Sequence, residues 1–486
     1  MRDISAVPKW NSVTLLLLGM CWLPAVFGDP EVSDKLPEPI VAALKHHGMS
    51  TRGLSLYVHG IGQSEPLLAV AADAPRQPAS AIKVLTTLAA LELLSPARRW
   101  KTEAYVTAPI LNGRLEGDLY IKGYGDPYLV IENFWRFLRV LRAEGLENIN
   151  GDLVLDQSYF AREPGDAAEF DNQPLRAYNV LPNALLVNFQ AVNFRFNPQP
   201  HANRVQIFAD PLPDNVEVEN RVTLTRGSCY GWARGLGMKV QQRNNQTRVI
   251  FNGTYDAACG ANELFRVVSD PAPYILGLFR VLWSEQGGRF VGGVRETTVP
   301  PEARLLSTAY SPPLADVIRS INKYSNNVMT RQLLLTLGAE HAGAPGTTEK
   351  GIQAIYEWLK QRELYFPELV LENGAGLSRK ETISARHLGA VLLTAWHSPY
   401  MPEFISSLSI SAMDGTLRKR FNNTSFDGRV HLKTGSLRDV RTLAGYVLDR
   451  MGRRVAVVCL YNHPRAETDV GEAVQEAVLK WVYERP

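Results

Sequence analysis

The chain has 486 residues, of which 45% are hydrophobic and 21% are charged, and its formal net charge is only +3. These values are ordinary for a globular protein with a sizeable core, and the length suggests about three domains of roughly 150 residues. A small net charge, without runs of Lys and Arg between aromatic residues, argues against nucleic acid as a partner. The chain has no metal-ligand spacing such as Cys-x-x-Cys, so the sequence supports neither a metal site nor a cofactor.

The N-terminus has the features of an export signal. Basic residues at positions 2 and 9 come first, residues 13–27 are mostly apolar, and a polar Asp-Pro pair follows at 29–30. The apolar stretch is too short to span a bilayer comfortably. We therefore expect a cleaved signal peptide over residues 1–28 and an exported mature protein, with at most a loose association with the membrane. A retained anchor is the alternative.

Three cysteines lie beyond this segment. Cys459 belongs to the strand-like run 455–461 and is expected to be an inert core thiol. Cys229 and Cys259 are expected to pair in an oxidising compartment, where they would close a loop across a segment rich in Gly and Arg.

The predicted secondary structure changes near residue 101, from helices and a hairpin to mostly short β-type runs. Before that point we expect a helix over 39–49, a hairpin formed by 54–58 and 67–70, and a helix that begins at Ser80. Residues 102–305 are mostly short β-type runs, and two helical patches interrupt them. These runs include 115–121, 151–155 and 184–189, and the patches are 132–146 and 271–285. We interpret 102–305 as an inserted β-rich region, built as two subdomains.

Helical texture returns after Pro312-Pro313. Residues 314–337 fit one helix with Ser325 in its middle, and two further helices are expected. The later elements are helices over 352–362 and 387–396, strands over 428–436, 443–448 and 454–461, and a last amphipathic helix. We expect residues 29–101 and 306–486 to form one α/β (α+β) domain, a sheet covered by helices.

Ser80-Ala81-Ile82-Lys83 places a lysine one helical turn after a serine, so the ammonium of Lys83 can reach the hydroxyl of Ser80. Burial, the positive end of the helix and a second nearby cation would lower the pKa of Lys83 and let it act as the base for a Ser80 nucleophile. The alternative is a Ser N-cap followed by a surface Lys. The pattern is not rare, because Ser320-Ile321-Asn322-Lys323 also matches it.

Two later segments add polar groups of the kind that such chemistry needs. Ser325-Asn326-Asn327 supplies a hydroxyl and amides on a helix, although such residues are usually solvated there. Lys433-Thr434-Gly435 is the only tripeptide of its kind in the chain, and Ser436 follows it. On a strand, Lys433 and Gly435 share one face, and the glycine lets a ligand backbone lie close. The alternative is an ordinary edge strand that ends in a turn.

In this order, the three segments resemble the motifs of the penicillin-recognising serine acyl transferases, which include β-lactamases and penicillin-binding proteins. The separation of Ser80 from Ser325, 325 − 80 = 245 residues, is longer than a compact β-lactamase needs. A large insertion here is similar to the class C low-molecular-mass penicillin-binding proteins, the D-alanyl-D-alanine carboxypeptidase/endopeptidase family. Further segments that match that family are 122–127, 373–379, 414–417 and 461–464.

The resemblance implies a penicillin-binding/β-lactamase-like transpeptidase domain that acts as a serine DD-peptidase in the periplasm. Its partners would be peptidoglycan stem peptides, with β-lactams as covalent inhibitors. The resemblance implies that Ser80 attacks the carbonyl of the penultimate D-alanine, that Lys83 takes the hydroxyl proton, and that Ser325 relays a proton to the leaving amine. It also implies that Asn327 holds Lys83 and the substrate amide, and that Lys433 sets the electrostatics of the site. Substrate binding would fall to Thr434, Gly435 and Ser436. The backbone N–H groups of Ser80 and Ser436 would form the oxyanion hole.

Three positions limit what the resemblance carries over. Ala375 stands where the family usually has Ser. Asp171 is only a candidate for binding the diamino acid of the peptide. His431 is expected to be a structural histidine whose hydrogen bonds are satisfied. The alternatives are a β-lactamase or esterase on the same scaffold, for which no second base is identifiable, and a catalytically inactive cell-wall binding module, which the intact motifs disfavour. A Ser-His-Asp hydrolase is disfavoured because no Gly-x-Ser-x-Gly elbow occurs.

Overall fold

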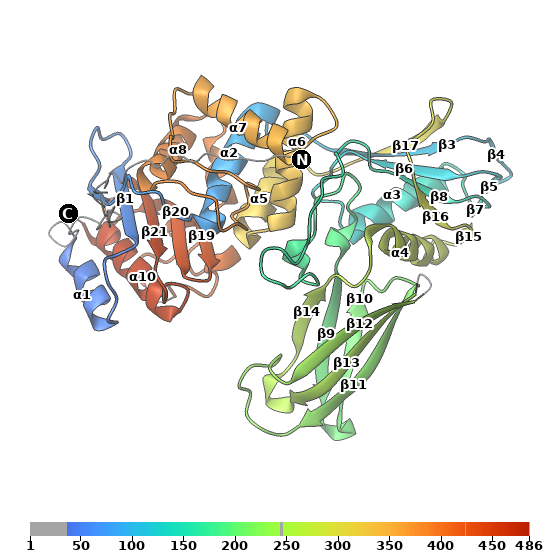
Figure 1. Ribbon diagram of the computed structural model, residues 1–486, viewed down its shortest axis with the longest axis horizontal. Helices are drawn as coiled ribbons and strands as arrows, with labels where there is room; N and C mark the ends of the chain where they lie inside the picture. The colour runs from blue at the N-terminus through green and yellow to red at the C-terminus, as the bar shows by residue number, and fades with distance from the viewer. Residues whose placement is uncertain (1–35, 244–245, 423, 486) are drawn as a thin grey trace, which may run out of the picture.

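The computed structural model describes residues 36–243, 246–422 and 424–485. The expected signal peptide, residues 1–28, lies outside these ranges. Figure 1 shows two halves side by side, with a β-rich lobe below the right-hand half. In the part of the chain that the structure describes, no helix is both long enough and apolar enough to cross a bilayer.

The left-hand half in Figure 1 is built on an antiparallel sheet of six strands. In sheet order the strands are β18 (Ser409–Ile410), β19 (Val430–Leu437), β20 (Val440–Leu448), β21 (Arg454–Asn462), β1 (Leu54–Gly60) and β2 (Leu68–Val70). β1 is buried along its whole length, and β21 is buried between its two ends. Such continuous apolar runs form strands that are covered on both faces. Because β1 lies beside β21, both ends of the chain build this sheet.

Helices cover both faces of the six-stranded sheet. On one face lie α1 (Glu38–His46) and α10 (Asp469–Glu484), which pack side by side. The opposite side carries α2 (Lys83–Leu94), α5 (Leu314–Tyr324), α6 (Asn327–Ala342), α7 (Thr348–Gln361), α8 (Ala385–His397) and α9 (Met401–Ser407). In α2, every residue from Lys83 to Leu91 is buried, as expected for a central helix that is apolar all round. Its N-terminus is therefore fixed by packing on every side.

The right-hand half begins and ends with a pair of antiparallel strands. β3 (Lys101–Val106) leaves the first half and β17 (Arg304–Tyr310) returns to it, with Lys101 opposite Tyr310. These two strands belong to a five-stranded sheet in the order β16 (Val294–Glu296), β8 (Leu153–Asp156), β6 (Leu119–Gly123), β3 and β17. A four-stranded sheet follows the order β15 (Arg289–Phe290), β7 (Asn148–Ile149), β5 (Arg114–Leu115) and β4 (Ile110–Leu111). α3 (Ile131–Ala143) and α4 (Pro271–Glu285) share a core with these strands.

The lower lobe consists of two three-stranded sheets. One has the order β10 (Arg204–Asp210), β9 (Val192–Gln199) and β14 (Asn262–Arg266), and the other has β11 (Val216–Thr225), β13 (Gln246–Asp256) and β12 (Leu236–Arg243). Phe194 and Phe196 of β9 meet Phe251 of β13 with ring centroids 5.0 and 5.1 Å apart, so the two sheets pack face to face. A Cys229–Cys259 disulfide ties the loop after β11 to the turn after β13, and Cys459 is a buried free thiol in β21.

The expectation of one helix over 314–337 is wrong, because the helix is interrupted at residues 325–326, between α5 and α6. Ser325 has the left-handed conformation (φ 55°, ψ 38°) that ends many helices. Asn326 then caps α6, since its side-chain oxygen accepts a hydrogen bond from the N–H of Met329 at 3.0 Å. A cap of this kind satisfies a backbone donor that a new helix leaves free.

Two further expectations need correction. The α-helix does not begin at Ser80, which lies in a 3₁₀ turn (Ala79–Ile82) that precedes Lys83, the first residue of α2. Residues 184–189 form no strand. Their last two members belong to a 3₁₀ turn (Asn188–Gln190), and the backbone of Phe189 is left-handed at φ 53°.

Candidate active site

Contacts from the sheet fix the turn that carries Ser80. Thr442 on β20 donates a hydrogen bond to the carbonyl of Pro78 at 2.7 Å. At the end of β21, Asn462 accepts one from the N–H of Gln77 at 2.8 Å through its side-chain oxygen. These bonds hold the chain directly before Ala79, which has a φ of +45° that residues with a side chain rarely adopt. The nucleophile turn therefore keeps an unusual backbone shape because the sheet holds it from one side.

Two glycines allow neighbouring segments to touch this turn. A Cβ atom on Gly376 would lie 2.0 Å from the carbonyl oxygen of Ala79, and one on Gly435 would lie 2.8 Å from the N–H nitrogen of Ser80. Both distances are too short for a side chain, so both positions require glycine. Strand β19 therefore passes directly beside the main chain of Ser80.

Lys83 lies wholly buried against Ser80. Its Nζ donates hydrogen bonds to Ser80 Oγ at 2.8 Å, to Asn327 Oδ1 at 2.6 Å and to the carbonyl of Ala375. A lysine has three N–H donors, so each has an acceptor here. Burial lowers the pKa of Lys83 well below its usual 10.5, the charge of Lys433 lowers it further, and the carboxyl of Glu381 opposes both effects. The geometry and the lowered pKa suit a base that takes the Ser80 proton.

A second buried lysine faces a second serine. Lys433 on β19 has no exposed surface, and its Nζ donates to Ser325 Oγ at 2.9 Å and to the carbonyl of Thr434 at 2.5 Å. Burial lowers the pKa of Lys433 to about 7. The left-handed backbone at the break between α5 and α6 directs Ser325 towards this lysine. A Lys433–Ser325 pair thus lies next to the Lys83–Ser80 pair.

The second Ser-x-x-Lys match has a structural role. The Nζ of Lys323 lies 2.5 Å from a carboxylate oxygen of Asp414, and it also donates to a backbone carbonyl. Two residues after Asp414, Thr416 accepts a hydrogen bond from Thr434 Oγ1 at 2.8 Å. This ion pair, in which Lys323 is buried and Asp414 is partly exposed, thus supports the turn that positions the hydroxyl of Thr434. Ser436, two residues further along β19, is exposed.

The structure brings together Ser80, Lys83, Asn327, Ser325 and Lys433, but Asp171 has local partners. The carboxylate of Asp171 accepts hydrogen bonds from the Tyr178 hydroxyl at 2.6 Å and from the Asn179 amide at 2.8 Å. Burial alone would raise the pKa of Asp171, but these hydrogen bonds outweigh it and lower the pKa. The expectation of a satisfied His431 is wrong for one atom, because its buried Nδ1 has no hydrogen-bond partner among the described residues.

Sequence reasoning gave no role to four residues that position the site: Glu381, Thr416, Thr442 and Asn462. Thr416 and Asn462 lie inside segments that match the family, and Glu381 follows such a segment by two residues. That proximity was the available signal for these three residues. Thr442 carried no such signal, since its role comes only from the pairing of β20 with β19 opposite Gly435.

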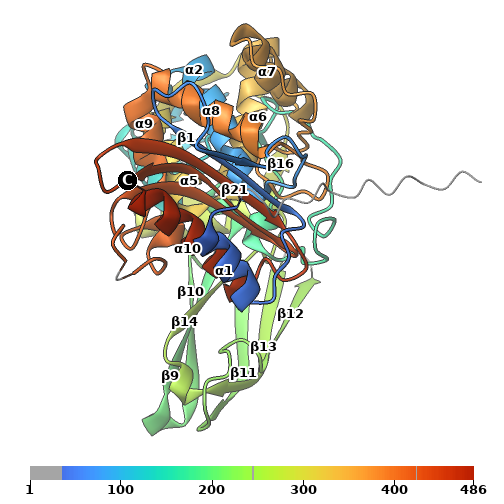
Figure 2. The ribbon, with the colours of Figure 1, turned by 90° about the vertical axis from the view of Figure 1, so that its left-hand side faces the viewer.

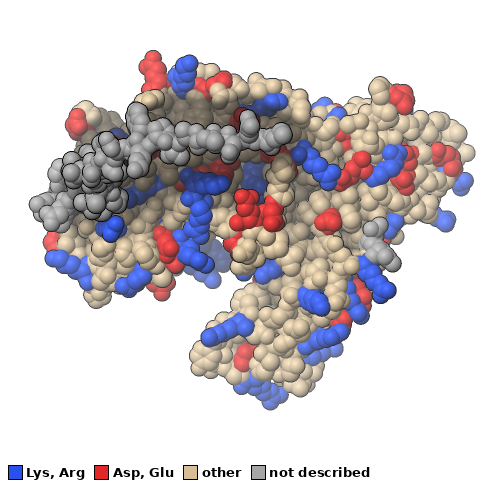
Figure 3. Space-filling model, viewed as in Figure 1, with Lys and Arg blue, Asp and Glu red and all other residues tan. Residues whose placement is uncertain are grey.

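The rim of the site joins the two halves of the molecule. Figure 3 shows a hollow near the middle of this face, with Lys and Arg side chains to its left and Asp and Glu side chains gathered to its right, over the segment 157–190. Arg379 donates to the carbonyl of Arg438 at 3.0 Å, and its guanidinium lies 5.2 Å from the ring centre of Phe170. The loop that carries Asp171 therefore meets the glycine-rich segment beside Ser80. No cluster of His, Cys, Asp and Glu side chains within the described ranges could hold a metal ion.

Comparison with known proteins decides the family. The model of the D-Ala-D-Ala carboxypeptidase 3 (S13) family matches residues 37–484. The chain belongs to this family. The expected class, a serine-type D-Ala-D-Ala carboxypeptidase, is thereby confirmed. A similar relative is the D-alanyl-D-alanine carboxypeptidase of Actinomadura sp. (strain R39), 29% identical over 455 residues that cover 90% of this chain and 83% of the relative.

Solved structures show that this S13 chain shares its fold with penicillin binding protein 4 (dacB) from Haemophilus influenzae. The TM-score is 0.76 at 23% identity, and the match covers 92% of this chain and 99% of that protein. A structure of the same protein complexed with a novel β-lactam gives a TM-score of 0.72 at 22% identity, with the same coverage. The expected fold class, a mixed α/β fold with extra β-rich sheets, is confirmed.

Proposed function

We propose that the protein is a periplasmic serine DD-peptidase that acts through a covalent acyl-enzyme on Ser80. Its substrates are the D-alanyl-D-alanine ends of peptidoglycan stem peptides and the D-alanyl cross-links between them. The observation that carries this proposal is the contact of buried Lys83 Nζ with Ser80 Oγ at 2.8 Å. Membership of the S13 family and the β-lactam bound to a protein of the same fold support it.

The neighbours of Lys83 direct its lone pair. A neutral lysine keeps two N–H bonds and gains one lone pair. Asn327 Oδ1 and the Ala375 carbonyl accept the two N–H bonds, so the lone pair faces Ser80 Oγ. As Oγ attacks the carbonyl carbon of the penultimate D-alanine, its proton passes to Nζ. The product of this addition is a tetrahedral oxyanion.

Two backbone N–H groups beside the turn, those of Ser80 and Ser436, are suited to stabilise that oxyanion. The close approach of Gly435 brings β19 next to Ser80, as an oxyanion hole requires. One such donor contributes about 3 kcal/mol to transition-state stabilisation in other hydrolases. Collapse of the oxyanion breaks the C–N bond and leaves the acyl ester on Ser80.

The second Lys–Ser pair handles the leaving group. The proton that Lys83 took from Ser80 passes through Ser325 Oγ, which accepts a hydrogen bond from Lys433, to the nitrogen of the departing D-alanine. The hydroxyls of Thr434 and Ser436, together with the Lys433 ammonium, bind the terminal carboxylate of the substrate. A water molecule then hydrolyses the ester and restores the Ser80 hydroxyl.

The rim residues suit a peptide that carries both charges. Basic and acidic side chains face each other across the hollow in Figure 3, and the diamino acid of a stem peptide has an ammonium and a carboxylate. Asp171 remains our candidate for the ammonium. The Cys229–Cys259 disulfide fits an oxidising compartment, and it therefore supports the periplasmic location that the N-terminal sequence predicts.

Two experiments test this function. Purified monomeric and cross-linked muropeptides are incubated with the protein, and mass analysis is expected to show released D-alanine and cleaved dimers. A fluorescent penicillin should label the protein one to one, and Ser80→Ala should abolish the labelling. Ser320→Ala, in the second Ser-x-x-Lys match, is the control that should label normally. Labelling of Ser80→Ala would contradict the proposal, and turnover of penicillin many times per second would favour a β-lactamase instead.

A further inference from the structure

We propose that Glu381 is a positioning residue for acylation: its carboxyl group holds the segment 372–375 so that the Ala375 carbonyl stays against Lys83 Nζ. This inference rests on the proposed roles of Ser80 and Lys83. It concerns a glutamate that touches neither the substrate nor the nucleophile.

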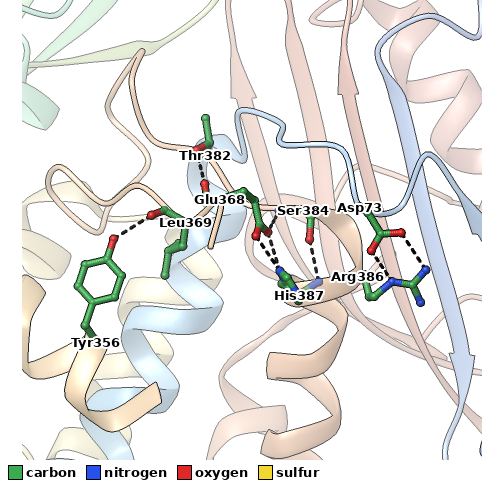
Figure 4. Close-up of polar contacts among 8 residues, drawn as sticks. All are labelled: Asp73, Tyr356, Glu368, Leu369, Thr382, Ser384, Arg386 and His387. Carbon is green, nitrogen blue, oxygen red and sulfur yellow. Dashed lines mark hydrogen bonds and ion pairs between the residues drawn. The ribbon is translucent and has the colours of Figure 1, made fainter. Parts of the chain in front are cut away.

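The segment belongs to a hairpin whose base is fixed away from the site. Val370 and Thr382 pair across it as an isolated bridge. Figure 4 shows the contacts of Glu368 at this base: its carboxylate accepts a hydrogen bond from the N–H of Ser384 at 2.8 Å and lies 2.7 Å from Nδ1 of His387. Its main-chain carbonyl accepts one from the Thr382 hydroxyl at 2.7 Å. These contacts tie the base to the start of α8 and leave the tip to be held separately.

One oxygen atom of Glu381 makes the largest set of contacts with the tip, and Thr86 and Asn373 each add a hydrogen bond: Thr86 Oγ1 donates to the Gly374 carbonyl at 2.7 Å, and Asn373 Oδ1 accepts from the N–H of Ala375 at 2.9 Å. Glu381 Oε1 accepts hydrogen bonds from three consecutive backbone N–H groups, those of Glu372 at 3.1 Å, Asn373 at 2.8 Å and Gly374 at 2.8 Å. The next residue, Ala375, turns its carbonyl towards Lys83 and lies 3.4 Å from Ser80 Oγ through that oxygen. The bonds to Glu381, together with those of Thr86 and Asn373, therefore orient this carbonyl, and none of them involves the side chain at position 375.

The burial of Glu381 lowers the stability of the folded protein, which a residue with a purely structural role would not need to do. It has no exposed surface, and its Oε2 is buried without a hydrogen-bond partner in the described part of the chain. A buried polar atom without a partner lowers stability. Burial raises the pKa of Glu381 and lowers that of Lys83, although each charge partly offsets the shift of the other. A buried acid and a buried amine thus contact neighbouring residues, Glu381 through the N–H of Gly374 and Lys83 through the carbonyl of Ala375, and the pKa of each is shifted towards its neutral form.

The consequence for the reaction follows from the donors of a neutral lysine. Two acceptors fix its two N–H bonds, and only then does the lone pair point at Ser80 Oγ. If the Ala375 carbonyl moves away, Nζ keeps one fixed acceptor and can rotate. The rate constant of acylation then falls, whereas non-covalent binding of the ligand to β19 is unaffected.

The test compares Glu381→Gln with Glu381→Met in the full chain. Gln keeps an oxygen that can accept the three N–H bonds, whereas Met fills a similar volume without an acceptor. Stopped-flow acylation by a chromogenic cephalosporin separates the non-covalent dissociation constant from the acylation rate constant, and active-site titration normalises both to folded protein. We expect the Gln variant to stay within about threefold of the unmodified protein in the rate constant, and the Met variant to fall by about 30-fold or more at an unchanged dissociation constant.

Two further variants keep the test decisive. Glu381→Asp, which retains the charge on a shorter side chain, should lose acylation rate even if the Met variant does not fold. Glu368→Gln is the matched control at the hairpin base and should acylate normally. The inference is overturned if Gln slows acylation as much as Met does, if Met and Asp leave the rate constant unchanged, or if Glu368→Gln is equally slow. Failure of the unmodified protein to acylate at all would instead refute the proposed function.

Discussion

Replacing Lys433 by Met is expected to stabilise the folded protein while it slows acylation. The amine has no exposed surface, and burial lowers its pKa from 10.5 to about 7. The difference of 10.5 − 7 = 3.5 pKa units, at about 1.4 kcal/mol for each unit, gives roughly 5 kcal/mol for carrying the protonated amine into this site. The proposed function explains why the folded protein keeps this unfavourable group, because it needs a cation beside Ser325.

The sign of the effect follows from proton binding. The unfolded chain binds the Lys433 proton more tightly than the folded one, so the stability of the unmodified protein rises with pH between about 7 and 10.5. At pH 7 most of the cost, about 4 kcal/mol, is present. Met removes this cost and loses two hydrogen bonds of about 1 kcal/mol each. The expected net gain is therefore about 2 kcal/mol at pH 7, and it vanishes at about pH 9, where the remaining cost equals the loss of the two hydrogen bonds.

Thermal unfolding at the two pH values measures this difference. At about 2–4 °C for each kcal/mol, the Lys433→Met variant should melt roughly 4–8 °C higher at pH 7 and no higher at pH 10. Lys323→Met is the control, because Lys323 is equally buried but paired with Asp414. That change should lower stability by about 1 kcal/mol, since the Asp414 carboxylate loses its cation but is partly exposed to water. A lower melting temperature of Lys433→Met at pH 7, or the same gain at pH 10, would refute the reasoning.

Three other changes have defined outcomes. Lys83→Arg keeps a positive charge at every working pH, so the acylation rate should fall by about 100-fold or more. The increase of that rate with pH, which follows the lowered pKa of Lys83, should also disappear. An unchanged pH profile would contradict the base role. Replacing Cys229 and Cys259 by Ser removes a disulfide between residues 30 positions apart and should lower stability by about 3–4 kcal/mol. Penicillin labelling of the folded protein should be unchanged. Loss of labelling in folded protein would show that the lower lobe supports the site. Thr442→Val removes the hydrogen bond to Pro78 and should slow acylation roughly tenfold at an unchanged circular dichroism spectrum, whereas an unchanged rate would mean that the turn is fixed without it.

Local patterns predicted most elements of the fold. The helix expected over 271–285 has the same limits as α4, because Pro271 suits a first helical turn and the apolar residues after it repeat at helical spacing. The three strands near the C-terminus were found from continuous apolar runs. The pairing of Lys83 with Ser80 also follows from local geometry, since one helical turn separates them. In each case the decisive contacts join residues that are near one another in the sequence.

The remaining features depend on contacts between distant residues. A serine carries no signal for the left-handed backbone seen at Ser325, and its side chain meets Lys433 more than a hundred positions later. Glu381 acts on backbone N–H groups that hold Ala375 against Lys83, and a lone glutamate gives no pattern in a sequence. The prediction of a strand over 184–189 is wrong for the same reason. Its apolar residues pack in several directions, Leu185 with the strands of the inserted half and Leu186 with Val328 of α6, instead of pairing in a ladder.

The pairing of β3 with β17 predicts that the half of the molecule between them is a replaceable module. Because Lys101 lies opposite Tyr310, the two ends of the insertion are only about 5 Å apart, a gap that a two-residue turn closes. We therefore expect that the segment between β3 and β17 can be exchanged without changing the order of the six-stranded sheet. The limit on such exchange is the outer side of α6, where Val328 and Leu335 are covered by residues of the insertion. Any replacement has to supply an apolar cover for that helix, or the bare surface becomes a site of self-association.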